Sequence, residues 1–381
     1  MVEMTLEDAL ATAAERHSKG DTETAIAIMR QLLTACPNFA PAQHGLVVML
    51  AGKGETAEAV VLMFLATRMT RDPMILTQLL RLLNDVKAHV NLIDACEEFQ
   101  DIFGEAPYVL NLWGHTLNGL SRFAEALPLL ERARIASPGN PLILHNLSSS
   151  LCNLGRYEDS VVVFGEKTRE WVQEASESSS NVAEQYSTLA SAYDGKPLHH
   201  SFAQRTLAAI RAERPSHPYH RVLDLGCGTG AIGQLLPSSS GVVVGIDLSS
   251  EMLSVALSTA RYGRLLHGDM TTIMSNLDAG FDTILSSGAL YHIADLSPVF
   301  IQVARLLETD GIFAFSVDPL PDGKDIAVTN PQEYCHSREY LRRLAKDTGL
   351  TELSIRIDVH RGPPGFWCVF KKGVSDGRVK S

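Results

Sequence analysis

The sequence lacks the features that mark disulfide-bonded, zinc-binding and membrane-spanning proteins. Its six cysteines lie far apart with no Cys-x-x-Cys pair, so neither a disulfide framework nor a zinc site is expected. No apolar run reaches the roughly 20 residues that a membrane-spanning helix needs. The opening MVEMTLEDALATAAERH has no cationic stretch followed by an apolar one, unlike a signal peptide. These absences predict a cytoplasmic protein without a bound metal.

The sequence also has fewer basic than acidic residues. The chain has 33 Lys and Arg against 44 Asp and Glu, a formal net charge of −11, and both halves are acidic. Non-specific binding to nucleic acid or to an anionic membrane is therefore not expected. The remaining composition, 45% hydrophobic and 20% charged, is that of a folded protein. At roughly 100–200 residues per domain, the 381 residues suffice for two domains.

The first part of the chain repeats with a period of 34 residues. Gly20 and Gly54 are separated by this interval, and so are Ser121 and Gly155 further on. A small residue such as Ala25 follows the turn position in each unit. We expect each unit to be a helix, a turn at Gly or Ser, and a second helix packed closely through the small residue. One such hairpin cannot bury its apolar face alone, so neighbouring hairpins stack.

This pattern resembles the tetratricopeptide repeat. Four units fit well, a less regular one spans residues 73–106, and Trp113–Gly114 stands where the family often has a large residue before a small one. The resemblance implies an all-α superhelix over residues 1–172. Its concave surface would bind a peptide or a partner subunit, or the array would act as a scaffold or a homodimer contact. An ordinary helical bundle is the alternative.

A polar, serine-rich segment follows the repeats. We expect residues 173–182 to be a linker and residues 183–381 to be a second domain. From Arg221 onward, short apolar strands alternate with helix-length segments, as in a doubly wound α/β domain. Only HRGPPG joins the last two expected strands. A connection this short requires an antiparallel hairpin.

A glycine-rich loop follows the first expected strand of this domain. In VLDLGCGTG, Asp224 lies inside the strand, and Gly226, Gly228 and Gly230 form the loop. Glycine turns let the backbone touch a ligand, and the following helix presents unsatisfied N–H groups. The segment GTGAIG alone also fits a dinucleotide-binding pattern. However, a carboxylate at Asp224 would repel a pyrophosphate, whereas it could bind the ammonium group of an amino acid.

Carboxylates also end the next two expected strands. Asp247, in GIDLSSEML, lies about 20 residues after the loop, where an acidic residue accepts hydrogen bonds from ribose hydroxyls. Asp269, in HGDM, is suited to the exocyclic amine of adenine, with Met270 packed on the ring. Adenine, ribose and an amino acid without phosphate together describe S-adenosylmethionine.

The ordered motifs resemble those of the class I S-adenosylmethionine-dependent methyltransferases. VLDLGCGTG, GIDLSSEML, GDM and FDTILSSGALYHIADL follow the family's order, and the closing hairpin is similar to its last two strands. With the repeats upstream, the chain resembles the predicted bacterial methyltransferases that carry tetratricopeptide repeats. The resemblance implies a Rossmann-like, seven-stranded sheet with its last strand antiparallel, and S-adenosylmethionine as the cofactor.

The resemblance also implies roles for particular residues. Asp224 and the glycine loop would hold the methionyl part, Asp247 the ribose, and Asp269 with Met270 the adenine. The cofactor-binding candidates are Tyr193, Asp224, Gly226, Gly228, Gly230, Asp247, Leu248, Met252, Asp269, Met270 and Ser286. The catalytic candidates are Tyr291 and His292, because they follow the fourth strand and an imidazole titrates near neutral pH. Further candidates for ligand contact are His199, His200, His336 and Arg361.

We expect methyl transfer to an oxygen or nitrogen nucleophile of a small molecule. The fourth motif, SSGALYH, is not the Asn/Asp-Pro-Pro-Tyr type, so exocyclic amines of nucleic-acid bases are not expected acceptors. A general base is needed only if the nucleophile carries a proton at neutral pH. Two alternatives stay open. The substrate could be a protein docked on the repeats, or the chain could be a non-catalytic interaction protein that binds the cofactor.

Overall fold

The computed structural model describes residues 5–37, 39–171 and 197–373. Contacts within the chain divide it into two units, Met1–Pro138 and Gly139–Ser381. The expected linker, residues 173–182, lies outside the described residues, so the division near residue 172 stays a prediction. In the part of the chain that is described, no helix is long and apolar enough to cross a membrane.

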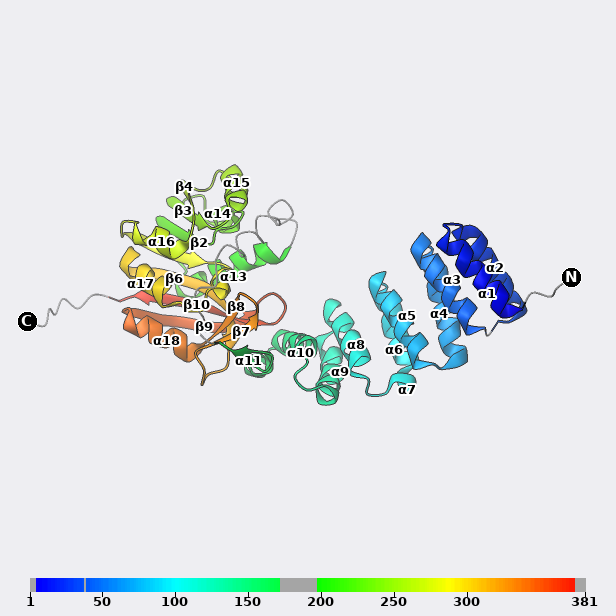
Figure 1. The fold of residues 1–381 in the computed structure, drawn as a ribbon. Coiled ribbons are helices and arrows are strands. Elements are labelled where there is room, and N and C mark those ends of the chain that lie inside the picture. The colour runs from blue at the N-terminus through cyan, green and yellow to red at the C-terminus, as the bar shows by residue number, and fades with distance from the viewer. Residues whose placement is uncertain (1–4, 38, 172–196, 374–381) are drawn as a thin grey trace, which may run out of the picture. The chain divides into compact units, whose positions relative to one another are not determined.

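The first unit is a series of helical hairpins (Figure 1). In each hairpin the helix contacts its successor: α1 with α2, α3 with α4, α5 with α6, and α8 with α9. The helices are α1 (Leu6–Ser18), α2 (Thr22–Ala35), α3 (Ala40–Lys53), α4 (Thr56–Thr70), α5 (Pro73–Asp85), α6 (His89–Glu98), α7 (Gln100–Phe103), α8 (Pro107–Gly119) and α9 (Phe123–Ala136).

The turn inside each hairpin contains a residue with positive φ. In the first unit these are Gly20 (+87°), Gly54 (+83°), Lys87 (+57°) and Ser121 (+60°), and Gly155 (+76°) is the equivalent in the second unit. The four turns predicted from the 34-residue period are confirmed. Lys87 supplies the turn of the irregular unit. Because side chains other than glycine strain this conformation, the turn is held by the packing of the two helices around it.

Small residues lie where the paired helices cross. Ala25, Ala59 and Ala126 are completely buried. At Gly114, a Cβ atom would lie 2.5 Å from Cγ of Leu130, so α8 and α9 approach too closely for a side chain at that point. The repeated hairpins are thus observed. The superhelix and the identity of the repeat remain predictions.

The second unit contains two further hairpin helices and a mixed α/β domain (Figure 1). Its helices are α10 (Pro141–Asn153), α11 (Tyr157–Gly165), α13 (Pro197–Glu213), α14 (Ala231–Leu235), α15 (Ser250–Ser258), α16 (Met270–Ser275), η1 (Leu290–His292), α17 (Ser297–Leu306) and α18 (Arg338–Asp347). Its strands are β1 (Arg169–Glu170), β2 (Arg221–Leu225), β3 (Val242–Asp247), β4 (Arg264–His267), β5 (Phe281–Ser286), β6 (Leu307–Leu320), β7 (Ile326–Asn330), β8 (Glu333–Ser337), β9 (Leu350–Val359) and β10 (Pro364–Lys372).

Among the described residues the sheet has ten strands, so the expectation of seven was wrong. The seven expected strands are present in the order β4-β3-β2-β5-β6-β10-β9, with β10 antiparallel to both β6 and β9. Three more strands are added because β6 continues to Leu320. Its last residues pair in parallel with β8, where Asp318 faces Cys335. Strands β7 and β1 then extend the sheet by antiparallel pairing.

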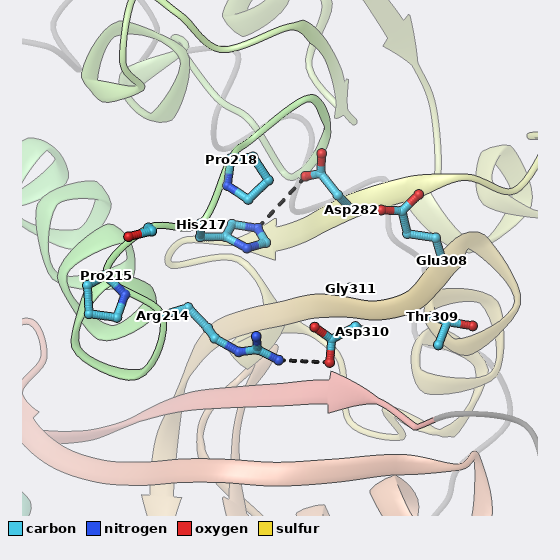
Figure 2. Close-up of a pocket in the computed structure, with 10 residues that line it drawn as sticks. Arg214, Pro215, His217, Pro218, Asp282, Glu308, Thr309, Asp310 and Gly311 are labelled. Atoms are coloured by element: carbon cyan, nitrogen blue, oxygen red, sulfur yellow. Dashed lines mark hydrogen bonds and ion pairs between the residues drawn. The ribbon is translucent and has the colours of Figure 1, made fainter.

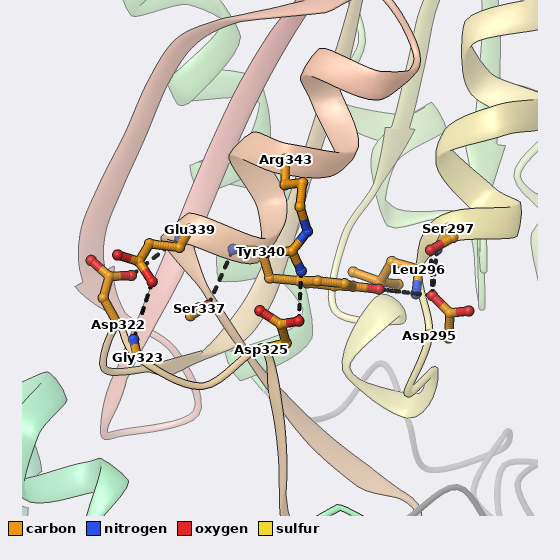
Figure 3. A network of polar contacts seen from close by, with 10 residues as sticks. All are labelled: Asp295, Leu296, Ser297, Asp322, Gly323, Asp325, Ser337, Glu339, Tyr340 and Arg343. Atoms are coloured by element: carbon orange, nitrogen blue, oxygen red, sulfur yellow. Dashed lines mark hydrogen bonds and ion pairs between the residues drawn. The ribbon is translucent and has the colours of Figure 1, made fainter.

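A network of polar contacts fastens the β6–β7 connection to α18 (Figure 3). The Arg343 guanidinium donates to the Asp325 carboxylate at 2.6 Å. The backbone N–H of Glu339 donates to Asp322 at 3.2 Å, while the Glu339 side chain accepts from the N–H of Gly323 at 3.2 Å. These contacts depend on the folded position of α18. No local pattern in the sequence predicts the three added strands, β1, β7 and β8.

Both faces of the sheet are covered by helices. On one face, side chains of α13 and α14 such as Ile210 and Ile232 join the inward residues of the strands in one core. On the other face, α16, α17 and α18 form a larger core that includes Phe300. This layered arrangement leaves the carboxyl ends of the parallel strands as the open edge where ligands bind in such folds.

The hairpin α10–α11 packs on this domain. Val161 belongs to the larger core of the sheet, and Phe164 packs with Leu320 and Cys335 in a separate buried cluster. At Gly165, a Cβ atom would lie 2.6 Å from the Pro321 ring. The last repeat of the sequence therefore belongs, by its contacts, to the same unit as the sheet.

Candidate functional site

The glycine loop follows β2 at the carboxyl edge of the sheet. Gly226, Gly228 and Gly230 have φ values of +70°, +53° and +90°. At Gly226 a Cβ atom would lie 2.5 Å from Cβ of Ala289, so this glycine permits a close approach between two loops. At Gly228, no described atom outside the adjoining residues lies within 4 Å of that position. The loop thus presents bare backbone to an open space at Gly228.

Asp247, at the end of β3, holds this loop in place. Its Oδ2 accepts a hydrogen bond from the N–H of Gly228 at 2.8 Å, and its Oδ1 accepts from the N–H of Ser249 at 2.9 Å. Burial raises the pKa of Asp247, although both backbone hydrogen bonds oppose the shift. Each carboxylate oxygen has further acceptor capacity, so Asp247 can also accept from hydroxyl groups of a ligand.

Asp224 is buried beneath the loop with one oxygen unpaired. Its Oδ2 accepts a hydrogen bond from the Tyr262 hydroxyl at 2.7 Å, whereas its Oδ1 has no partner in the described part of the chain. Burial raises the pKa of Asp224 to about 7; the Tyr262 hydrogen bond opposes this shift and the charge of Asp247 adds to it. An ammonium group would supply the missing partner. The site therefore fits the amino-acid and ribose parts of S-adenosylmethionine.

Asp269 and Met270 lie beside the loop, after β4. Asp269 caps α16, accepting from the N–H of Thr272 at 2.8 Å and from the hydroxyl of Thr271 at 2.5 Å. Partial burial opposes ionisation, but these hydrogen bonds lower the pKa of Asp269. Cε of Met270 lies 4.0 Å from the position of a Cβ at Gly226. Both side chains are thus at the edge where the sequence predicts the adenine.

Three other cofactor-binding candidates have structural partners. The Ser286 side chain is fully buried, and its hydroxyl donates to the carbonyl of Leu225 at 2.8 Å, joining β5 to β2. Met252 is buried in α15. Leu248 is half-buried, and its carbonyl contacts Nε2 of His267 at 3.0 Å. Tyr193 lies outside the described residues.

The catalytic candidates Tyr291 and His292 lie in η1, directly after β5. Their ring centroids lie 4.2 Å apart with the ring planes tilted by 42°, and the Arg361 guanidinium lies 4.1 Å from the centroid of Tyr291. Nδ1 of His292 contacts the carbonyl of Gln332 at 2.9 Å. Because a carbonyl can only accept, Nδ1 carries the proton. Burial lowers the pKa of His292, so the ring is neutral at physiological pH.

The other candidates for ligand contact are dispersed. His336 is completely buried, with Nε2 2.9 Å from the carbonyl of Ala294, and burial lowers its pKa to about 4. His200 is exposed on α13, and the side chain of His199 lies outside the described residues. Arg361 lies against Tyr291 and is therefore placed close to the catalytic candidates.

A buried ionic cluster at the end of β6 was not predicted from the sequence. Asp318 accepts from Nδ1 of His360 at 2.8 Å and from the Arg361 guanidinium, which also donates to Glu333 at 2.6 Å. Burial opposes ionisation of Asp318, but the charge of Arg361, the His360 contact and the charge of Lys167 lower its pKa well below the usual range. In the sequence, the one local feature that pointed to this cluster is the adjacent pair His360 and Arg361 in HRGPPG.

A pocket lies at the opposite edge of the sheet (Figure 2). It has a volume of about 390 Å³ and is lined by residues 214–218, Asp282 and residues 308–311. Within it, Arg214 donates to Asp310 at 2.9 Å, and Nε2 of His217 lies 3.8 Å from Asp282. None of the residues predicted to bind the cofactor lines this pocket.

Comparison with known proteins identifies the domain that carries the glycine loop. Residues 216–352 match the family described as "Methyltransferase domain". This part of the chain is therefore similar to methyltransferase domains. Its cofactor is S-adenosylmethionine. The match includes the loop, Asp224, Asp247, Asp269 and the strands that position them.

Two curated relatives are themselves described as methyltransferases. A malonyl-[acyl-carrier protein] O-methyltransferase from Enterobacter lignolyticus is 29% identical over 158 residues, which are 41% of this chain and 62% of that protein. The putative methyltransferase YqeM from Bacillus subtilis is 37% identical over 139 residues, 35% of this chain and 55% of that protein. The chain therefore spans little more than half the length of these relatives.

Among solved structures, magnesium protoporphyrin IX methyltransferase from Synechocystis PCC 6803 with bound S-adenosylmethionine aligns with 53% of this chain and 100% of its own. The sequence identity is 17% and the TM-score 0.42.

Proposed function

We propose that the protein transfers a methyl group from S-adenosylmethionine to an oxygen or nitrogen atom of a small molecule. The observation that carries the proposal is the Asp247 carboxylate bonded to the N–H of Gly228, beside the unpaired oxygen of Asp224. The match to a methyltransferase domain supports it, and so does a relative that methylates a malonyl group on its carrier protein.

The roles of the residues follow from their positions. Asp224 and the backbone of residues 226–230 would hold the amino-acid part of the cofactor, Asp247 the ribose, and Asp269 with Met270 the adenine. When bound, the cofactor supplies a methyl group already activated by its sulfonium. The protein's own tasks are to align the acceptor, exclude water and accept a proton where the acceptor carries one.

We also propose that the hairpins of the first unit are tetratricopeptide repeats acting as a scaffold, a dimer contact or a docking surface in a cytoplasmic protein. The recurrence of turns with positive φ at Gly20, Gly54 and Ser121, and of buried alanines at the helix crossings, supports this assignment. The acidic composition disfavours nucleic acid as a partner.

Calorimetric titration tests whether the protein binds S-adenosylmethionine, as the proposed function requires. The full-length protein should bind S-adenosylmethionine with a measurable heat and give none with NAD at the same concentrations. Tight binding of NAD, or no binding of S-adenosylmethionine by protein that is folded by circular dichroism, would reject the proposed function.

A further inference from the structure

A buried carboxylate–imidazole pair lies at the carboxyl end of β6. Oδ1 of Asp318 and Nδ1 of His360 are 2.8 Å apart, and the two side chains are 2% and 0% exposed. Because Asp318 is held ionised, its oxygen accepts and Nδ1 of His360 donates. In the neutral ring, Nε2 of His360 then carries a lone pair, and this nitrogen has no hydrogen-bond partner among the residues that the structure describes.

The surrounding charges hold this arrangement. Arg361 bridges Asp318 and Glu333, and the charge of Lys167 also favours the ionised form of Asp318. An imidazole whose Nδ1–H is fixed by a carboxylate is oriented with its other nitrogen ready to accept a proton, and the carboxylate stabilises the imidazolium that results. At His292, by contrast, Nδ1 contacts a neutral carbonyl, that of Gln332.

Aromatic rings enclose His360. Its ring centroid lies 4.8 Å from that of Phe202, 5.7 Å from that of Tyr291 and 5.6 Å from that of Trp367. Nε1 of Trp367 is also buried without a partner in the described structure. Buried polar groups are normally paired. One unpaired acceptor and one unpaired donor within the same group of rings therefore point to a ligand that supplies both partners.

This group of rings borders the cofactor site. The Phe202 ring comes within 2.9 Å of the position that a Cβ would take at Gly288. The next residue, Ala289, is the one that contacts the glycine loop at Gly226. The loop that follows β5 therefore contacts both this group of rings and the glycine loop.

We propose that His360 is the general base of the reaction and that the acceptor is a phenol-type hydroxyl. This inference rests on the proposed function. The acceptor's proton passes to Nε2 of His360 while its oxygen bonds to the methyl carbon. The carbon–sulfur bond of the donor breaks, with both electrons left on sulfur, and the proton is later released to water. A phenol carries a proton that a base must remove, whereas a carboxylate acceptor does not, and its ring matches the aromatic surroundings.

The variant that isolates this role is His360→Asn. An asparagine amide can still donate to Asp318 from the place of Nδ1, but it has no atom equivalent to Nε2. The matched control is His217→Gln, a buried histidine at the opposite edge of the sheet, whose Nε2 contact with Thr283 an amide can retain.

With 4-methylphenol as acceptor, His360→Asn should lower turnover by about 100-fold or more. Its calorimetric affinity for S-adenosylmethionine should stay within about 2-fold of the unaltered protein, and the control should keep its turnover. Equal turnover in His360→Asn would overturn the assignment of the base. If the unaltered protein binds S-adenosylmethionine but does not methylate 4-methylphenol, the inference fails and the proposed function stands. If it does not bind S-adenosylmethionine, the proposed function fails.

Nitrogen NMR of full-length protein labelled at histidine tests the pair without turnover and without a variant. At pH 7 with S-adenosylhomocysteine bound, the His360 signals should show a proton on Nδ1 and none on Nε2. Addition of 4-methylphenol should shift the Nε2 signal, whereas 4-methylbenzoate should not. A proton on Nε2, or equal shifts with the two probes, would overturn the inference.

Discussion

At the scale of single residues, Asp247 joins the glycine loop to β3 through two backbone hydrogen bonds. Asp247→Ala removes both, and with them the proposed contact to ribose. We expect the affinity for S-adenosylmethionine, measured by calorimetry, to fall more than about 10-fold, since hydrogen bonds to a charged group contribute about 1.5–3 kcal/mol each. Asp247→Asn, which keeps one acceptor oxygen, should show a smaller loss. Unchanged affinity in Asp247→Ala would refute the role in cofactor binding.

Asp224 predicts a dependence of stability on pH. Its pKa rises from the ordinary aspartate value of 3.8 to about 7 in the folded protein, because burial penalises the charged form. A carboxyl with a raised folded-state pKa binds more protons when folded, so its stabilising contribution is fully present below about pH 4 and is lost as pH rises through about 7. The free energy of unfolding should therefore fall between pH 5 and pH 8 in the cofactor-free protein.

Urea unfolding of Asp224→Asn checks this sign. The variant keeps an oxygen for the Tyr262 hydroxyl but cannot ionise. Its stability relative to the unaltered protein should increase from pH 5 to pH 8. A constant difference over that range would show that Asp224 does not titrate as described.

At the scale of elements, α11 packs on the sheet of the second unit. Phe164 is 1% exposed and packs with Leu320, Ala327 and Cys335. Phe164→Ala should lower the free energy of unfolding of the second unit by about 3–5 kcal/mol, as expected for a large aromatic ring removed from a packed core.

Val162 is the control on the same helix. Its side chain is 54% exposed, so Val162→Ala should change the stability by less than about 0.5 kcal/mol. Denaturant unfolding measures both variants. Equal effects would mean that α11 does not pack on the sheet.

The strands differ in how far local patterns predicted them. Strands β2 to β6 each combine an apolar run with a following turn, and the short HRGPPG connection made β9 and β10 antiparallel. Strands β1, β7 and β8 are short, and each exists because it pairs with a neighbour, ultimately with the extended end of β6. The residues of a strand that depends on such pairing need not show a strand pattern of their own, so the strand is difficult to predict from the sequence.

At the scale of the whole molecule, the two units divide at Pro138 and Gly139. Removal of residues 1–138 should leave a unit that unfolds cooperatively and binds S-adenosylmethionine. Removal of residues 1–171 takes away Val161 and Phe164 as well, uncovering the core of the sheet. We expect the shorter fragment to unfold at a lower temperature or to aggregate, as measured by calorimetric melting. Equal melting temperatures would contradict the assignment of α10–α11 to the second unit.

The longer fragment also distinguishes the two kinds of acceptor. If the fragment lacking residues 1–138 retains turnover on a small acceptor, docking on the hairpins of the first unit is not required. Loss of turnover with intact binding of S-adenosylmethionine would instead favour a substrate held by those hairpins.

The sequence alone determined the repeated hairpins, the glycine loop and the acidic residues at the strand ends. Each of these depends on nearby residues: a turn that tolerates positive φ, a small residue at a helix crossing, or a carboxylate directly after an apolar strand. Only the tertiary structure decided that the last hairpin packs on the sheet and that Asp318, His360 and Arg361 form one cluster. Those contacts join segments more than 40 positions apart in the chain, and the packing of the sheet, not any local pattern, brings them together.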